Sequence, residues 1–361
     1  MEEGEDQVMS EVHLGCPPRF SGPYISHFTF ALPSTDVVDE RTNNISPTEG
    51  SSSQNLSLDN DSNLAGYQAE DNDHILEQGT PSILTLDEDG DLVLNRRRNE
   101  KERCLSYALA IQHNISSSLW SVGLQVWRAA LLLADFVLHK GCTSCDFNGI
   151  TAIELGSGTG LVGIALARIA RTVFITDRDT DILENCTTNA QLNSSLLKFQ
   201  DTKVHVRELD WKESWPPTVG NFDLLSHTGS RYSWASSEIE EAERATVILA
   251  ADVIYSDDLT DLFFSILEKL MSHGSEKVLY LALEKRYNFS MNDLDVVANG
   301  YAHFRSFLKD DEECGSHDDA SLPVFRGKQI DLSEIPQYIR EYERGKDLEI
   351  WEITYCSDQL K

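Results

Sequence analysis

The chain is short of basic side chains. Its 361 residues hold 30 Lys plus Arg against 60 Asp plus Glu, which gives a formal charge of −30. Binding to nucleic acid depends on Lys and Arg that neutralise phosphate charge, so this deficit disfavours a nucleic-acid partner and favours a basic protein partner. The acidic excess is densest in residues 1–100, which hold 20 acidic and 5 basic side chains.

The sequence also lacks a long apolar run. No stretch approaches the ~20 apolar residues that cross a bilayer, and the N-terminus, MEEGEDQVMS, is acidic where a secretory signal would be basic and then apolar. The seven cysteines are an odd number spread over the chain, which is typical of free thiols in a reducing compartment. We expect a soluble, intracellular monomer of the nucleus or cytoplasm, without a membrane partner.

Metal-binding patterns are missing too. Cys142 and Cys145 form a single CxxC pair without a second pair or a nearby histidine, so the sequence predicts no metal site. Residues 95–103, NRRRNEKER, are a short basic cluster in the acidic chain. Nuclear import and a solvated linker are both open interpretations of this cluster.

Composition divides the chain into three parts. Residues 1–75 are rich in Ser, Asn, Asp and Thr without a sustained period of 2 or 3.6, so we expect an acidic, disordered tail. Residues 76–122 are predicted to hold a β-hairpin and a linker, because alternating runs flank Asp-Gly in SILTLDEDGDLVL. Residues 123–361 are predicted to form the domain that carries the chemistry.

Strands and helices alternate from residue 149 onward. Strands separated by helices of this length pair in parallel through right-handed crossovers. The last two predicted strands, residues 302–308 and 348–355, have no clear crossover helix between them, which favours an antiparallel final pair. The sequence therefore predicts an α/β fold with a doubly wound, Rossmann-like sheet and an N-terminal β-hairpin extension.

A glycine-rich turn follows the first of these strands. The segment ELGSGTG places Gly156, Gly158 and Gly160 before a helix, where glycine lets the backbone pass close to a nucleotide-like ligand. With Gly163, the stretch also matches the GxGxxG pattern of dinucleotide sites. The glycine spacing alone therefore does not choose between cofactors, and a purely structural turn is a third interpretation.

Acidic side chains at three successive strand ends distinguish the cofactors. Glu154 precedes the first glycine, where a carboxylate attracts an ammonium group and repels a pyrophosphate. Asp177 ends the second strand and can accept hydrogen bonds from ribose hydroxyls. Asp210 ends the third and can accept one from an adenine amino group while Trp211 packs on the ring. A cofactor that has an ammonium group, a ribose and an adenine but no phosphate is S-adenosylmethionine. Capping of a helix or turn is the alternative role for Asp177 and Asp210.

At these residues the chain resembles the seven-strand protein lysine methyltransferases of methyltransferase family 16. The resemblance covers about residues 105–357 and is carried by ELGSGTGLVGIALA, by GLQVWRAA with Trp127, by LDW, and by the Asp-x-x-Tyr motif of Asp252 and Tyr255 after Ala251. It implies a seven-stranded sheet of order 3-2-1-4-5-7-6 with an antiparallel last strand. It also implies that Trp127 and Ala251 border the cofactor and that Asp252 and Tyr255 lie at the substrate lysine.

Sheet topology places Asp252 independently of the resemblance. Ligands of doubly wound sheets bind beyond the carboxyl ends of the strands where the strand order reverses, and Glu154 and Asp252 follow the two strands at that point. Asp252 would hold a neutral amine in line with the transferred methyl, and Tyr255 would shape the pocket. Capping of the next helix is the alternative for Asp252.

The predicted function is therefore transfer of methyl from S-adenosylmethionine to the ε-amine of a lysine in a basic protein, and the resemblance adds heat-shock chaperones as expected partners. A methyltransferase acting on nucleic acid or small molecules is one alternative, although the turn ADVIY lacks the prolines that grip a flipped base. A non-catalytic binding module is another, although Glu154 and Asp252 argue against it. We expect removal of residues 1–75 to leave cofactor affinity unchanged.

Overall fold

The computed structural model describes residues 7–12, 20, 22–33, 104–197, 199, 201–217, 219, 231–290, 295–309 and 325–356. Residues 1–32 and 105–361 form one unit and residues 33–104 a second, and the described residues belong almost entirely to the first. The hairpin predicted at residues 82–94 and the basic cluster at residues 95–103 lie outside the described residues.

One large mixed sheet holds eight strands, in the order β12-β13-β14-β9-β8-β5-β6-β7. The bounds of these strands are β5 Thr151–Leu155, β6 Thr172–Asp177, β7 Lys203–Glu208, β8 Val247–Ala251, β9 Val278–Glu284, β12 Leu308–Lys309, β13 Phe325–Gln329 and β14 Leu348–Tyr355. The strands from β7 to β9 are parallel, and β14 runs antiparallel to both β9 and β13. With β13 as the sixth strand, the predicted order 3-2-1-4-5-7-6 is confirmed, and the short β12 adds an eighth strand.

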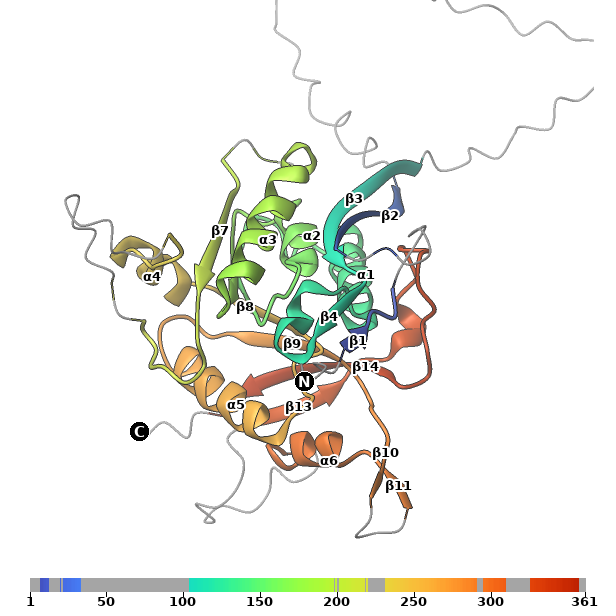
Figure 1. The fold of residues 1–361 in the computed structure, drawn as a ribbon. Helices are drawn as coiled ribbons and strands as arrows, with labels where there is room; N and C mark the ends of the chain where they lie inside the picture. Colours follow the sequence, from blue (N-terminus) through green and yellow to red (C-terminus); the bar gives the residue numbers. More distant parts are fainter. Residues whose placement is uncertain are drawn as a thin grey trace, which may run out of the picture. The chain divides into compact units, whose positions relative to one another are not determined.

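Helices cover both faces of this sheet (Figure 1). One hydrophobic cluster contains side chains of α1 (Arg128–Thr143), α2 (Leu161–Ala167) and α3 (Thr180–Leu192). A second contains side chains of α4 (Ser236–Glu243), α5 (Asp257–Met271) and α6 (Asn299–Ser306). Along β5, Ala152 belongs to the first cluster and Ile153 and Leu155 to the second, as the period of two in a strand requires.

The position of the sixth strand was predicted wrongly. Residues 302–308 were expected to be a strand, but most of them lie in α6. Tyr301, Phe304 and Phe307 recur at the helical spacing of three residues, and Phe304 is fully buried among the side chains of the second cluster. The strand beside β14 is instead β13, whose less apolar sequence, FRGKQ, gave a weaker signal.

Smaller strand pairs lie outside the large sheet. They are β1 (Gln7–Met9) with β4 (Ser116–Ser118), β2 (Pro23–Pro33) with β3 (Cys104–Asn114), and β10 (Asn288–Ser290) with β11 (Asp295–Val297). A 3-10 helix, η1 (Leu119–Leu124), leads from β4 toward α1, and two shorter ones are η2 (Ser194–Leu196) and η4 (Leu332–Glu334).

Strands β1 and β2 lie within residues 1–75 and correct the expectation of a disordered tail there. In β2, every second side chain from Ser26 to Leu32 is buried, and Phe28 and Phe30 belong to the first hydrophobic cluster. The alternation in PYISHFTFALP is the pattern of a half-buried strand. This region was predicted to be a disordered tail because the sequence around the alternating segment is polar.

Two asparagines of α3 and a third at its C-cap, Asn193, hold the backbone of β3. Asn193 accepts from the Ala110 amide at 2.9 Å and donates to its carbonyl at 2.8 Å. Asn189 makes the same pair of bonds to Gln112, at 2.7 and 3.0 Å, and Asn185 donates to the Gln112 carbonyl at 3.0 Å. Because the asparagines are four residues apart, they lie on one face of the helix and satisfy strand groups that would otherwise be unpaired.

One stretch of the chain is long enough to cross a membrane, contrary to the expectation from the sequence. Residues Leu119–Thr143 are long and apolar enough by length and composition alone, because they contain an 18-residue window with a mean hydropathy of 1.5. In the structure, 61% of that window is buried inside the protein. Its apolar side chains from α1 pack in the first hydrophobic cluster, as those of a core helix do.

Candidate active site

The glycine turn between β5 and α2 is left-handed at three positions. Gly156, Gly158 and Gly160 have φ values of +60°, +54° and +74°, which residues with a Cβ rarely adopt. A Cβ on Gly158 would lie 2.9 Å from the carbonyl oxygen of Gly123, and one on Gly156 would lie 2.8 Å from Cγ1 of Val253. The turn is therefore packed so closely against its neighbours that these positions need glycine.

Glu154 ends β5 beside this turn and is almost fully buried. Its Oε2 accepts a hydrogen bond from the Gly163 amide at 2.9 Å, and a Cβ on Gly163 would lie only 2.5 Å from that oxygen. Burial raises the pKa of Glu154 to about 8, and the nearby Asp177 carboxylate adds to the rise. Neutral pH therefore favours the protonated form, and a cation bound beside it would favour the carboxylate.

Asp177 and Asp210 lie at the ends of β6 and β7, as predicted. Asp177 Oδ2 accepts from the Gly158 amide at 3.0 Å, which ties the end of β6 to the glycine turn. Burial raises the pKa of Asp177. The side chain that caps α3 is Asp179, so helix capping does not account for Asp177. Asp210 Oδ1 accepts from the Lys212 amide at 2.9 Å, so one of its oxygens closes its own turn.

Two tryptophans supply aromatic faces near these acids. Trp211 packs edge-on against Phe263, with ring centroids 5.3 Å apart. Trp127 lies immediately before α1 and donates its Nε1 hydrogen to the Val122 carbonyl at 3.1 Å. Both rings border one cavity, where a flat aromatic surface can hold an adenine ring or a cation.

Asp252 adopts a strained backbone conformation just after β8. Among the residues that the structure describes, it is the non-glycine residue with a positive φ, at 56°. Its amide donates to the Ala282 carbonyl of β9 at 2.9 Å, which holds this conformation in place. Strain of this kind persists only where surrounding structure supports it, and it clusters at functional sites. The N-cap of α5 is Ser256, so Asp252 does not cap that helix.

The carboxylate of Asp252 is buried and only half satisfied. Its residue is 9% exposed, and its Oδ2 accepts from Arg286. Its Oδ1 is buried without a hydrogen-bond partner. Burial raises the pKa of Asp252, and the Arg286 guanidinium opposes the rise. An unpaired buried carboxylate oxygen is costly, which makes it a candidate contact for a ligand.

Tyr255 lies at the mouth of the site. It is 54% exposed, and Leu119 and Trp120 of η1, which line the same cavity, are 59% and 79% exposed. Apolar side chains that stay this exposed around one opening mark a surface for binding another molecule. The position of Tyr255 is compatible with its predicted role in shaping the substrate pocket.

One cavity of about 690 Å³ brings the predicted residues together at the carboxyl ends of β5, β6, β7 and β8. Ten of the eleven predicted site residues line it: Trp127, Glu154, Gly156, Gly158, Asp177, Asp210, Trp211, Ala251, Asp252 and Tyr255. Its lining has six carboxyl side chains and two basic ones, Arg178 and Lys212. This balance favours a cationic ligand over a phosphorylated one.

Gly160 is the exception, and its role as a cofactor contact stays a prediction. It is not among the residues that line the cavity, and it forms the N-cap of α2. A Cβ there would meet Ile175 and the Cys186 sulfur at 3.4 and 3.5 Å. Its left-handed conformation therefore serves the entry into the helix and the packing of α2.

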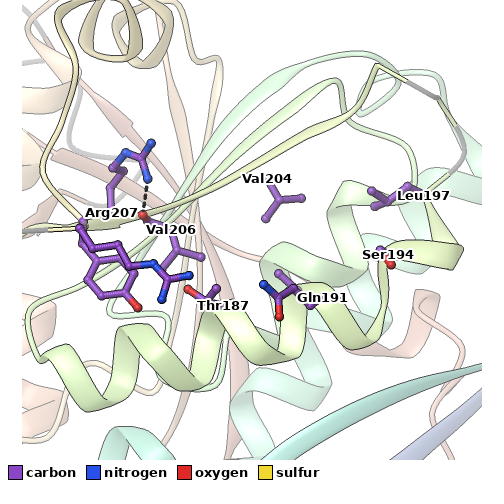
Figure 2. Close-up of a pocket in the computed structure, with 10 residues that line it drawn as sticks. Thr187, Gln191, Ser194, Leu197, Val204, Val206 and Arg207 are labelled. Atoms are coloured by element: carbon purple, nitrogen blue, oxygen red, sulfur yellow. Dashed lines mark hydrogen bonds between the residues drawn. The ribbon is translucent and has the colours of Figure 1, made fainter.

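A second cavity, of about 350 Å³, lies between α3 and β7 (Figure 2). Thr187, Gln191 and Ser194 line it from the helix side. Arg207 is engaged elsewhere, with Glu238 and with the Val206 carbonyl at 2.6 Å. None of the predicted site residues lines this cavity, so the chemistry is assigned to the larger one.

Comparison with known proteins agrees with this geometry. The family model described as lysine methyltransferase matches residues 106–232. Methyltransferase-like protein 22 of Mus musculus is 38% identical over 276 residues, which are 76% of this chain and 65% of that protein. Protein N-lysine methyltransferase METTL21A of Mus musculus is 35% identical over 179 residues, which are 49% of this chain and 67% of that protein.

The chain belongs to the lysine methyltransferase family. This confirms the family expected from the motifs. The matched residues 106–232 include the glycine turn and all three strand-end acids, whereas Asp252 and Tyr255 lie beyond them. Among solved structures, the magnesium protoporphyrin IX methyltransferase of Synechocystis PCC 6803 aligns with a TM-score of 0.35 and 14% identity, over 63% of this chain and 83% of that one.

In this member of the lysine methyltransferase family, a group of paired charges that was not predicted from the sequence lies beside Asp252. Arg286, two residues beyond the end of β9, pairs with Asp252. Arg128 of α1 bonds Glu284 at 2.6 Å and Glu11 at 2.8 Å. The other acids were predicted because they stand at the carboxyl ends of strands. The same argument applied to β9 would have predicted Glu284 and Arg286 as site residues.

The N-terminal segment, residues 7–12, does not line the cavity but supports a residue of its wall, Gln125. Gln125 Nε2 donates to the Val8 carbonyl at 2.7 Å, and Gln125 itself borders the cavity. Val12 is 3% exposed and lies in the first hydrophobic cluster. These contacts link the N-terminal segment to the residues just before Trp127.

Deletion of residues 1–12 should therefore weaken binding of S-adenosylhomocysteine, the product of the predicted cofactor, by roughly tenfold or more. Loss of the Val8 carbonyl leaves Gln125 without one of its partners at the cavity wall. Isothermal titration calorimetry measures the change. Deletion of residues 1–6, which keeps Val8 and Val12, is the matched control. Equal affinity of both truncated forms and the full chain would restore the expectation drawn from the sequence.

Proposed function

We propose that this protein is an S-adenosylmethionine-dependent protein-lysine N-methyltransferase. The observation that carries the proposal is the position of Asp252, a residue of the same cavity as the glycine turn, together with its buried Oδ1, which has no hydrogen-bond partner. The chain spans 65% of the length of methyltransferase-like protein 22, so activity, substrate and partners are proposed here from its own residues.

The residues of the cavity fit S-adenosylmethionine. Glu154 would face the ammonium group, Asp177 the ribose hydroxyls and Asp210 the adenine amino group. The backbone of Gly156 and Gly158 would border the ligand. Both positions need glycine, because a Cβ at either one would collide with neighbouring protein atoms. Trp127, Trp211 and Ala251 complete the walls. When bound, this cofactor supplies an electrophilic methyl group.

Asp252 would position the substrate amine. Its free Oδ1 can accept a hydrogen bond from an N–H of the lysine ε-amine, which orients the nitrogen lone pair toward the methyl. Tyr255 on the rim would flank the aliphatic part of the lysine side chain. The described residues at this end of the cavity offer no histidine, so the lysine would lose its proton to solvent before attack.

A basic segment of a protein is the substrate class that suits the opening. Asp258 lines the cavity, and Asp257 and Asp261 are its neighbours in the first turns of α5. Such carboxylates attract lysine-rich segments, although acids in a first turn also complement the helix dipole. Chaperone substrates, a monomeric state and location in the nucleus or cytoplasm stay predictions.

The test is incubation of the purified full chain with methyl-labelled S-adenosylmethionine and a cell extract. We expect label in protein, recovered as methyl-lysine after acid hydrolysis and insensitive to nuclease. Label that nuclease removes would indicate a nucleic-acid methyltransferase. Label in small molecules would indicate a small-molecule methyltransferase on the same fold. Binding of cofactor without any transfer would support a non-catalytic module.

A further inference from the structure

Arg286 lies where three elements of the site meet. Its NH2 group pairs with Asp252 Oδ2, and its guanidinium carbon lies 5.0 Å from the ring centre of Trp127. The preceding residue, Lys285, anchors the chain through a 2.9 Å bond from its amide to the Asp347 carbonyl. Stacking on one side and ion pairing on the other hold the guanidinium in one orientation.

A second buried Asp-Arg pair in the same protein provides a comparison. Asp135 is fully buried, and its Oδ2 accepts from Arg344 at 2.7 Å and from Tyr342 at 2.6 Å. Its other oxygen accepts from two backbone amides. Asp135 is thus fully satisfied, as structural buried carboxylates are, whereas Asp252 keeps one oxygen unused.

We propose that Arg286 is a positioning residue for the substrate lysine: it occupies one oxygen of Asp252, leaves the other for the amine, and favours the neutral amine through its positive charge. This inference rests on the proposed function. Arg286 does not itself line the cavity, so it acts through Asp252 and through its charge.

The charges around Arg286 determine how its removal would act. Asp252 faces it from the end of β8, and Glu284 precedes it at the end of β9. Glu284 is paired with Arg128, which also holds Glu11. Together, Arg286, Arg128, Asp252, Glu284 and Glu11 carry one net negative charge. Without the charge of Arg286 the other four would carry two, which would stabilise the lysine ammonium and disfavour the nucleophilic amine.

The test compares Arg286→Gln and Arg286→Lys with the wild-type full chain across a pH series, using a protein substrate identified by the labelling experiment. For Arg286→Gln we expect the rising limb of kcat to move up by about one pH unit, with about a tenfold lower kcat at neutral pH that recovers as the pH rises. Arg286→Lys retains the positive charge, so its kcat should rise over the same pH range as that of the wild type. KM for the substrate should not increase in Arg286→Gln.

Lys285→Gln is the matched control. It removes one positive charge from the neighbouring position, where Lys285 pairs with Glu349 at 2.6 Å instead of with Asp252. We expect its pH profile to follow that of the wild type. Calorimetric binding of S-adenosylhomocysteine, expected to be unchanged in each variant, separates an effect on the lysine from a collapse of the site.

Four results would overturn the inference. A uniform loss of kcat in Arg286→Gln at every pH, or loss of S-adenosylhomocysteine binding, would assign Arg286 a structural role only. A gain in activity would show that Arg286 blocks the oxygen that the lysine needs. In these three cases methylation by the wild type leaves the proposed function intact. Absence of lysine methylation by the wild type would refute the proposed function and this inference together.

Discussion

Replacement of Asp252 by asparagine is expected to lower kcat/KM for lysine methylation by roughly 100-fold or more. Asparagine tolerates the left-handed conformation at this position better than alanine does, so the backbone should be retained. Arg286 can donate only to the amide oxygen, so that oxygen would turn toward it and the amide NH2 would face the cavity. The substrate amine would then meet a donor where it needs an acceptor.

The measurement is steady-state transfer of labelled methyl to the protein substrate, beside calorimetric binding of S-adenosylhomocysteine. We expect binding to be retained, since the predicted contacts with ammonium, ribose and adenine lie on other strands. Asp331→Asn is the control, because the Asp331 carboxylate also accepts a hydrogen bond, from the Ser333 amide at 2.9 Å, but lies outside the cavity. Activity of Asp252→Asn within a few-fold of the wild type would remove Asp252 from the proposed mechanism.

Replacement of Gly158 by alanine is expected to weaken S-adenosylhomocysteine binding by roughly 100-fold, because small displacements of a positioned site have effects of this size. The new Cβ would lie 2.9 Å from the carbonyl oxygen of Gly123, which is backbone and cannot turn aside. The left-handed φ of +54° adds strain for any residue with a Cβ. The turn would have to move, and with it the amide that bonds Asp177.

Gly149→Ala separates strain from crowding in this experiment. Gly149 has a similar φ of +68°, but a Cβ there meets nothing within 4 Å. Its replacement should lower the free energy of unfolding by about 1 kcal/mol through backbone strain and leave ligand affinity unchanged. Calorimetry and thermal unfolding measure the two quantities. If Gly158→Ala bound the ligand as well as Gly149→Ala does, the glycine turn would not be part of the cofactor site.

Most residues of the candidate site could be located from the sequence because they stand at strand ends. The carboxyl ends of parallel strands meet at one edge of a sheet, so Glu154, Asp177 and Asp252 had to lie near one another once the strand order was known. Gly160 was predicted as a cofactor contact together with Gly156 and Gly158, as a glycine of the turn before the helix. Only the packing of α2 shows that a Cβ at this position would meet Ile175.

The errors in the fold have physical causes of a different kind. Residues 302–308 form a short apolar run in which a strand and a helix face look alike, and burial of Phe304 beside α5 favours the helix. The segment of β2 is a genuine alternating pattern surrounded by polar sequence. Its burial depends on β3, which follows about 70 residues later and could not be paired with it from local pattern.

Periodicity and chain order were enough to predict the parallel strands, the helices between them and the strand ends that carry the acidic side chains. The order of the strands was implied only by the resemblance of the motifs to the lysine methyltransferases. Tertiary structure alone decided that Asp252 is left-handed, that Arg286 takes one of its oxygens, and that Glu11 reaches Arg128. Ion pairs between segments far apart in the chain depend on packing and side-chain rotamers, which no local pattern records. The acidity of the chain is therefore partly explained by residues whose partners only the fold reveals.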